Sequence, residues 1–89
     1  MAHPTMISQK LQSVKPLSDH RLLLSFANGE TKIFDVTPYI IGSWMGELAN
    51  EEYFRSVQIH PLLPDTVMWP NEQDIAPHEL YQLSIATIE

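Results

Sequence analysis

The Asn28-Gly29 pair constrains the fold more than any other feature of this sequence, because it separates two apolar runs at residues 21–26 and 33–36. An Asn-Gly pair in this setting predicts a β-hairpin with a two-residue type I′ turn, since both residues adopt positive φ at low cost. The chain is therefore expected to fold around an antiparallel hairpin in its N-terminal half.

Side chains of this predicted hairpin alternate between two faces. The two-residue turn sets Leu24 opposite Ile33 and Leu23 opposite Phe34. One face then carries Leu22, Leu24, Phe26 and Ile33, and the other carries Leu23, Phe34 and Val36. Both faces are apolar, so both need cover. The second covering layer could be a C-terminal helix, a loop or a second chain, and the pattern does not choose among them.

Turn residues and hydrophobic periodicity predict further elements before and after this hairpin in the sequence. A strand is expected over residues 11–17, short helical turns over 37–56, and two short strands at 57–59 and 66–69. Pro77 is expected to open a helix from His78 to about Ile85, because proline is favoured at the first helical position. The predicted class is α+β: a small, mainly antiparallel sheet built on an N-terminal three-strand meander, with short helices and a C-terminal helix.

A length of 89 residues allows one domain. Residues 1–9 lack periodicity and are expected to form a flexible N-terminus, and residues 10–89 a single α+β domain. The chain has no cysteine, which excludes disulfides and thiolate chemistry. No apolar run approaches the roughly 18 residues of a membrane-spanning helix. A cytoplasmic protein with no membrane contact is therefore expected.

Charge is distributed unevenly along the chain, which carries a formal net charge of −6. Residues 1–34 hold four Lys and Arg against two Asp and Glu, whereas residues 35–89 hold nine Asp and Glu against Arg55 alone. Such asymmetry is typical of a solvated acidic surface, and the functional alternative is a face that attracts a basic partner protein. Direct nucleic-acid binding is not expected, because it needs a basic stripe.

Candidate catalytic and metal-binding residues form no recognised motif. The histidines (His3, His20, His60 and His78) never have the His-x-x-x-His spacing that places two imidazoles on one helix face. Glu51 and Glu52 are adjacent and would point apart on a helix, which is unsuitable for a paired acid and base. The sequence also lacks a Gly-x-Ser-x-Gly elbow and a glycine-rich phosphate loop. No enzymatic activity, catalytic residue, metal or cofactor is expected.

Large apolar residues are the remaining candidates for function. Trp69 precedes Pro70 at the end of a predicted strand, where an indole usually covers the core and bonds a loop carbonyl. The alternative is an interface anchor, since tryptophan contributes strongly to protein contacts. For Trp44 and its neighbour Met45, core and interface are weighed nearly equally. The candidate interface set is Trp44, Met45, Leu23, Phe34 and Trp69.

Several short segments follow one another in a distinctive order: residues 14–17, 22–30 and 33–36, then Val67-Met68-Trp69-Pro70-Asn71 and Glu79-Leu80-Tyr81. This series resembles a bacterial family known as domain of unknown function 2442 (DUF2442), over roughly residues 10–84. The resemblance implies a compact α+β domain without established catalytic residues. It also implies an antitoxin-like role, because members are often encoded beside another small protein.

Three functional hypotheses follow. The first is a non-enzymatic protein-interaction domain, an antitoxin-like protein whose acidic half binds a small basic protein. The second is an accessory or dimerisation domain of a transcriptional regulator that lacks its own helix-turn-helix segment. The third is a small-ligand-binding domain with a pocket near Trp69, Asp74 and His78. A homodimer is also expected, because both hairpin faces are apolar.

Overall fold

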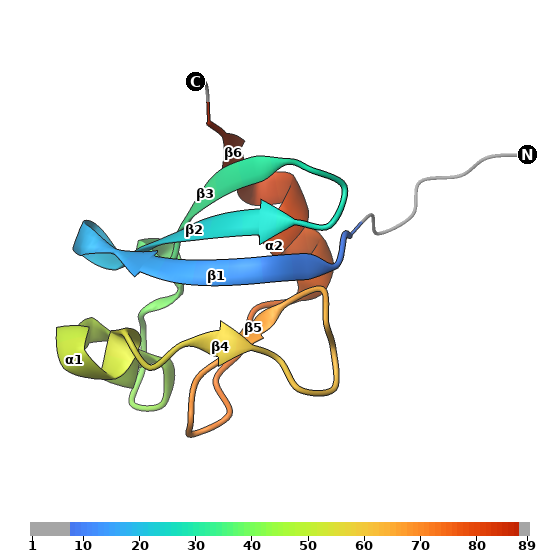
Figure 1. The fold of residues 1–89 in the computed structure, drawn as a ribbon. Coiled ribbons are helices and arrows are strands. Elements are labelled where there is room, and N and C mark those ends of the chain that lie inside the picture. The colour runs from blue at the N-terminus through green and yellow to red at the C-terminus, as the bar shows by residue number, and fades with distance from the viewer. Residues whose placement is uncertain (1–7, 88–89) are drawn as a thin grey trace, which may run out of the picture.

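The computed structural model describes residues 8–87, which form two antiparallel sheets and several short helices (Figure 1). The first sheet has the strand order β1-β2-β3-β6, with β1 (Leu11–Leu17), β2 (Arg21–Phe26), β3 (Thr31–Asp35) and β6 (Ile85–Ala86). The second pairs β4 (Gln58–Ile59) with β5 (Val67–Met68). The predicted α+β class and the N-terminal meander are confirmed. Residues 1–7 of the predicted flexible segment lie outside the described residues.

The helices are short. They are η1 (Ser18–His20), η2 (Thr37–Tyr39), η3 (Met45–Ala49), α1 (Glu51–Phe54) and α2 (Pro77–Leu83). The α1 helix begins as the sequence predicts, because the Asn50 side chain accepts a hydrogen bond from the Tyr53 amide at its N-terminus. Among the described residues, no helix is long and apolar enough to cross a membrane.

The turn between β2 and β3 differs from the predicted type I′ turn. Gly29 has a φ of 95°, but Asn28 does not have the positive φ that type I′ also requires. The Gly29 amide donates to the Phe26 carbonyl over 3.0 Å, and the Phe26 amide donates to the Glu30 carbonyl over 2.8 Å. The hairpin therefore has a three-residue loop that ends in a left-handed glycine.

This extra loop residue shifts the predicted register by one position and reassigns the hairpin faces. Leu22 lies opposite Phe34 and Leu23 lies opposite Ile33. The predicted faces were therefore wrong for three residues: Phe34 and Val36 are buried with Leu22, whereas Ile33 shares the other face with Leu23. One face then gathers the large buried side chains of β2 and β3, with Lys32 opposite Leu24 as its charged member, and burial of this apolar set favours the observed register.

The hydrophobic core lies on that apolar face of the four-stranded sheet. Its buried side chains come from the sheet and from η3, α1, β5, α2 and the loops between them, namely Leu11, Leu22, Leu24, Phe26, Phe34, Val36, Leu48, Phe54, Val67, Trp69, Ile75 and Leu80. In Figure 1 the α2 helix lies behind the sheet. We call the opposite side the outer face; its hydrophobic residues Leu23 and Ile33 do not pack against the core.

The C-terminal helix is shorter than predicted. It ends at Leu83, and Ser84 has the extended backbone angles φ −75° and ψ 156°. The Tyr81 carbonyl accepts hydrogen bonds from the Ser84 hydroxyl and from Lys32 Nζ, each over 2.9 Å. Ile85 then pairs with Ile33 in strand β6, which the sequence analysis missed. The prediction that the helix extends to about Ile85 was therefore wrong.

Candidate interaction site

The segment from η3 to α1 places carboxylates and an exposed tryptophan on one part of the surface. Glu51 and Glu52 lie in the first turn of α1, where the helix dipole favours negative charge, and both are exposed. Glu47 lies in η3, the helix that precedes α1 in the sequence. Trp44 precedes η3 and is 53% exposed. We call Trp44, Glu47, Glu51 and Glu52 the acidic surface.

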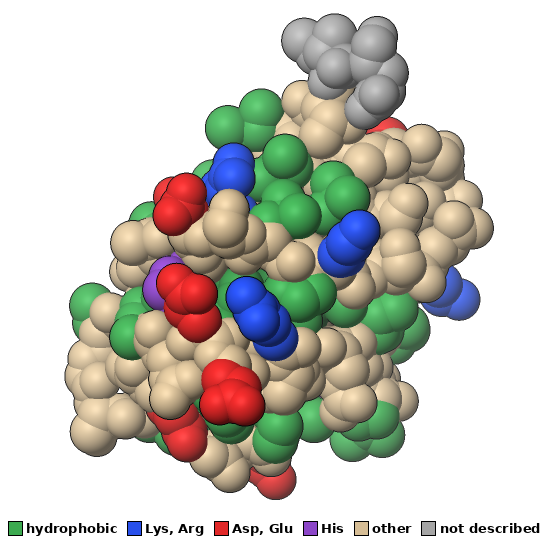
Figure 2. All heavy atoms as spheres, turned by 60° about the vertical axis from the view of Figure 1, so that its left-hand side comes forward, with side chains coloured by type: hydrophobic (Ala, Val, Ile, Leu, Met, Phe, Trp, Pro, Cys, Tyr) green, Lys and Arg blue, Asp and Glu red, His purple; other side chains and the backbone are tan. Residues whose placement is uncertain are grey.

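No basic side chain forms an ion pair with these carboxylates in the described part of the chain. Within residues 8–87, the only contact of 4.0 Å or less between a carboxylate and a basic side chain joins His60 Nε2 to Asp74 Oδ2 at 3.8 Å. The exposed Arg55 follows α1 directly and lines a hollow with Glu51. In Figure 2, most of the Asp and Glu side chains in view lie in the lower half, where a Lys or Arg side chain lies among them. The acidic C-terminal part of the sequence therefore folds into a surface on which Glu51 and Glu52 form no ion pair within 4.0 Å.

A polar network holds this surface in place. Gln73 is fully buried, and its amide nitrogen donates to the Trp44 carbonyl and to Glu47 Oε1, each over 2.9 Å. Its amide oxygen accepts from the Tyr53 hydroxyl over 2.7 Å. Hydrogen bonds from Asn71 and Gln73 hold the pKa of Glu47 below its ordinary value. The loop after β5 thus fixes the backbone of η3.

The residues of the candidate interface set lie in different places. Trp44 is exposed, and its indole nitrogen donates to the Asn71 carbonyl over 3.0 Å. Met45 is partly buried and packs against the core. Leu23 is partly buried on the outer face.

Phe34 and Trp69 are core residues, and this corrects their place in the interface set. Phe34 is 1% exposed and Trp69 is fully buried, with its indole nitrogen donating to the Phe54 carbonyl over 2.9 Å. Their side chains are therefore not offered to a partner. Leu23 and Phe34, which the predicted register placed together, lie on opposite faces.

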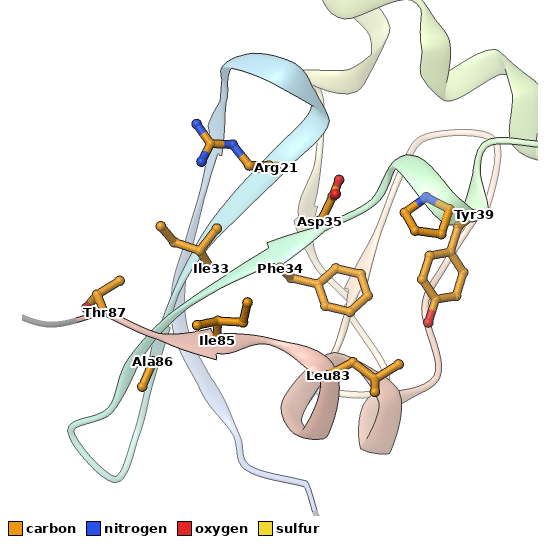
Figure 3. Close-up of a pocket in the computed structure, with 10 residues that line it drawn as sticks. Arg21, Ile33, Phe34, Asp35, Tyr39, Leu83, Ile85, Ala86 and Thr87 are labelled. Atoms are coloured by element: carbon orange, nitrogen blue, oxygen red, sulfur yellow. The ribbon is translucent and has the colours of Figure 1, made fainter.

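An open groove runs along the edge of the four-stranded sheet where β6 ends. It encloses about 560 Å³, and its lining is mostly apolar. Figure 3 shows Ile85 and Leu83 on one side of this groove, Tyr39 on the other, and Phe34 between them. Leu83 and Ile85 are 62% and 74% exposed, so much of their apolar surface faces solvent.

Sequence reasoning missed this groove because it continued the C-terminal helix to about Ile85 and did not predict β6. The available signal was the surplus of apolar residues after Leu80, together with Ser84 at the helix end. The groove also lies away from the predicted ligand pocket. Of the residues predicted for that pocket, Asp74 lines a separate hollow, which it shares with His60.

His60 lies in the loop between β4 and β5, near a carboxylate. Its Nδ1 accepts hydrogen bonds from the amides of Leu62 and Leu63 over 3.0 and 3.1 Å. Its Nε2 lies 3.8 Å from Asp74 Oδ2. This imidazole organises the loop through the two amides that donate to Nδ1. Among residues 8–87, no three His, Asp or Glu side chains are grouped as metal ligands.

Tyr39, which lines the groove, forms a side-chain pair with Glu79. The Tyr39 hydroxyl donates to Glu79 Oε1 over 2.7 Å, which connects η2 to α2. Burial, and then the hydrogen bond and charge of Glu79, raise the pKa of Tyr39 to about 12. The folded state therefore favours the neutral phenol.

Folding stability should consequently depend on this phenol at high pH. The contribution of Tyr39 is fully present below the ordinary phenol pKa of about 10 and is lost as pH rises through its folded value. The hydrogen bond to Glu30 also raises the pKa of Tyr81, so we expect absorbance at 295 nm to show late ionisation of both Tyr39 and Tyr81, and Tyr39→Phe to remove one of these late phenols. Two late phenols that persist in Tyr39→Phe would contradict this assignment.

A comparison with known protein families gives a match that covers the elements described above. The family model described as "Protein of unknown function (DUF2442)" matches residues 11–86, from the start of β1 to the end of β6. No curated protein and no solved structure matches the chain. Because the family match covers most of the 89 residues, this chain belongs to the DUF2442 family.

Proposed function

We propose that this chain is a non-enzymatic protein-interaction domain that binds a small basic protein through its acidic surface. The observation that carries the proposal is the position of Trp44, which is half exposed yet held by hydrogen bonds at both its indole and its carbonyl. A rigid, exposed aromatic residue loses little side-chain entropy on binding and is typical of energetically important contacts.

The surrounding charge specifies the chemistry of the partner. Among the described residues, Glu51 and Glu52 form no ion pair within 4.0 Å with a Lys or Arg side chain. A basic partner therefore need not displace an existing ion pair. Opposite charge would accelerate encounter and fix the orientation of the two proteins. The exposed Ile41, 72% accessible, adds apolar area close to Trp44 in the chain.

The test is co-expression with the product of the neighbouring gene, followed by size-exclusion chromatography. We expect the two proteins to co-elute, and Trp44→Ala to weaken the complex by at least about tenfold, equivalent to about 1.4 kcal/mol. Independent elution at micromolar concentrations would contradict the proposal.

A charge test uses Glu51→Gln with Glu52→Gln, which raises the net charge by two. The matched control is Gln12→Lys with Ser13→Lys, which makes the same charge change on exposed positions of β1. We expect only the α1 variant to weaken binding and to reduce its dependence on salt, because local rather than total charge guides the contact. Equal effects of the two variants would contradict a local acidic surface.

A further inference from the structure

The outer face of the four-stranded sheet carries an apolar row that no described element covers. The row runs across three adjacent strands, since Leu23 on β2 lies opposite Ile33 on β3, and Ile33 lies opposite Ile85 on β6. On β1, Lys15 lies opposite Leu23 and borders this apolar row. The row is continuous with the groove, which Ile33 and Ile85 also line. Contiguous exposed apolar surface of this kind marks an interaction site.

Charged residues flank this row in a regular arrangement. Arg21 lies directly opposite Asp35 in the β2–β3 register, yet the two side chains form no ion pair within 4.0 Å. Arg21 Nε donates to the Ser18 carbonyl, and Asp35 Oδ1 accepts from the Thr37 amide. Each side chain therefore retains capacity for an opposite charge from outside the chain.

We propose that the outer face binds the outer face of a second copy of this chain, around a twofold axis parallel to the strands and between β2 and β3. This axis lies in the interface, over the middle of the four-stranded sheet, whose order is β1-β2-β3-β6. It exchanges the positions of β2 and β3, so Leu23 of each copy meets Ile33 of the other. It also sets Arg21 of each copy against Asp35 of the other.

The charge of this face favours a second copy over a basic protein. Its strands present Lys15 and Arg21 against Asp35, whereas a basic partner is attracted to the acidic surface formed by η3 and α1. A twofold contact pairs Arg21 of each copy with Asp35 of the other and needs no other molecule, while Lys15 on β1 lies over β6 of the other copy. The outer face and the acidic surface thus serve two different contacts, and this inference does not depend on the proposed function.

The first test compares two isoleucines with nearly equal exposure. Ile85 on the outer face is 74% exposed, and Ile41, outside that face and groove, is 72% exposed. Light scattering of the wild-type chain should give the mass of a dimer at about 100 µM. Ile85→Lys should weaken the dimer by at least about tenfold, because each dimer carries the change twice. Ile41→Lys should leave the dimer unchanged, with folding of both variants verified by circular dichroism.

The second test exchanges the flanking charges. Arg21→Asp places like charges opposite each other across the twofold axis, as does Asp35→Arg, and each should weaken the dimer by about tenfold or more. The double variant restores opposite charges and should recover most of that loss. A wild-type chain that remains monomeric would overturn the proposal, as would a dimer sensitive to Ile41→Lys but not to Ile85→Lys. Failure of the double variant to recover would overturn the proposed axis.

Discussion

Replacing Trp69 with alanine will remove about 3–5 kcal/mol from the free energy of unfolding, the range found when large aromatic residues are truncated in a core. The indole is fully buried and lies 5.6 Å from the Phe54 ring, centroid to centroid. Its loss also removes one of two donors to the Phe54 carbonyl, which keeps only the 3.3 Å hydrogen bond from the Val57 amide. Because small domains have a total stability of about 5–15 kcal/mol, this substitution would remove a large fraction of it.

The other tryptophan is the natural control for this prediction. Trp44 is 53% exposed, so Trp44→Ala should cost about 1 kcal/mol or somewhat more through its lost hydrogen bond and partial burial. Urea denaturation followed by circular dichroism at 222 nm compares the two variants directly. Equal losses for both would contradict the assignment of Trp69 to the core and Trp44 to the surface.

The substitution Gln73→Glu will destabilise the chain by about 3–5 kcal/mol at pH 7, because it introduces a buried charge without a compensating partner. The Gln73 amide nitrogen faces two acceptors, the Trp44 carbonyl and Glu47 Oε1. A carboxylate oxygen at this position would repel both. A protonated carboxyl could again donate to one of them, so its folded-state pKa is raised. Stability is therefore retained below the ordinary glutamate pKa and lost as pH rises.

The matched control is Gln82→Glu, the same substitution at an exposed position of α2. It should change the free energy of unfolding by less than about 0.5 kcal/mol. Thermal unfolding from pH 4 to pH 8 separates the two variants: only Gln73→Glu should approach the wild-type melting temperature as pH falls. A Gln73→Glu variant as stable as the wild type at pH 7 would contradict the buried network.

The fold class follows from local signals in the sequence, whereas the register of the hairpin does not. Apolar alternation and turn residues indicate β1, β2 and β3 correctly. Asn28-Gly29 fits two turns, however: a two-residue turn with both residues at positive φ, and a three-residue loop with only Gly29 left-handed. Burial of Phe34 and Val36 against distant elements favours the second. Such tertiary contacts are invisible to a local pattern.

Strand β6 and the buried amide were missed for related reasons. A two-residue strand is too short for periodicity, and the apolar residues Leu80, Leu83 and Ile85 do not by themselves show that the helix ends at Leu83. Glutamine is usually exposed, so no pattern distinguishes Gln73 as a buried residue. For the candidate site, the charge asymmetry and Trp44 were predictable from sequence. The groove and the outer face required the correct register and β6.

The most direct test of the proposed contact is hydrogen exchange of the chain alone and in complex with the product of the neighbouring gene. If the acidic surface is the contact, backbone amides of η3 and α1, residues 45–54, should exchange more slowly in the complex. Amides of the loop between β4 and β5 should exchange at unchanged rates. Unchanged exchange over residues 45–54 in a verified complex would contradict binding through the acidic surface.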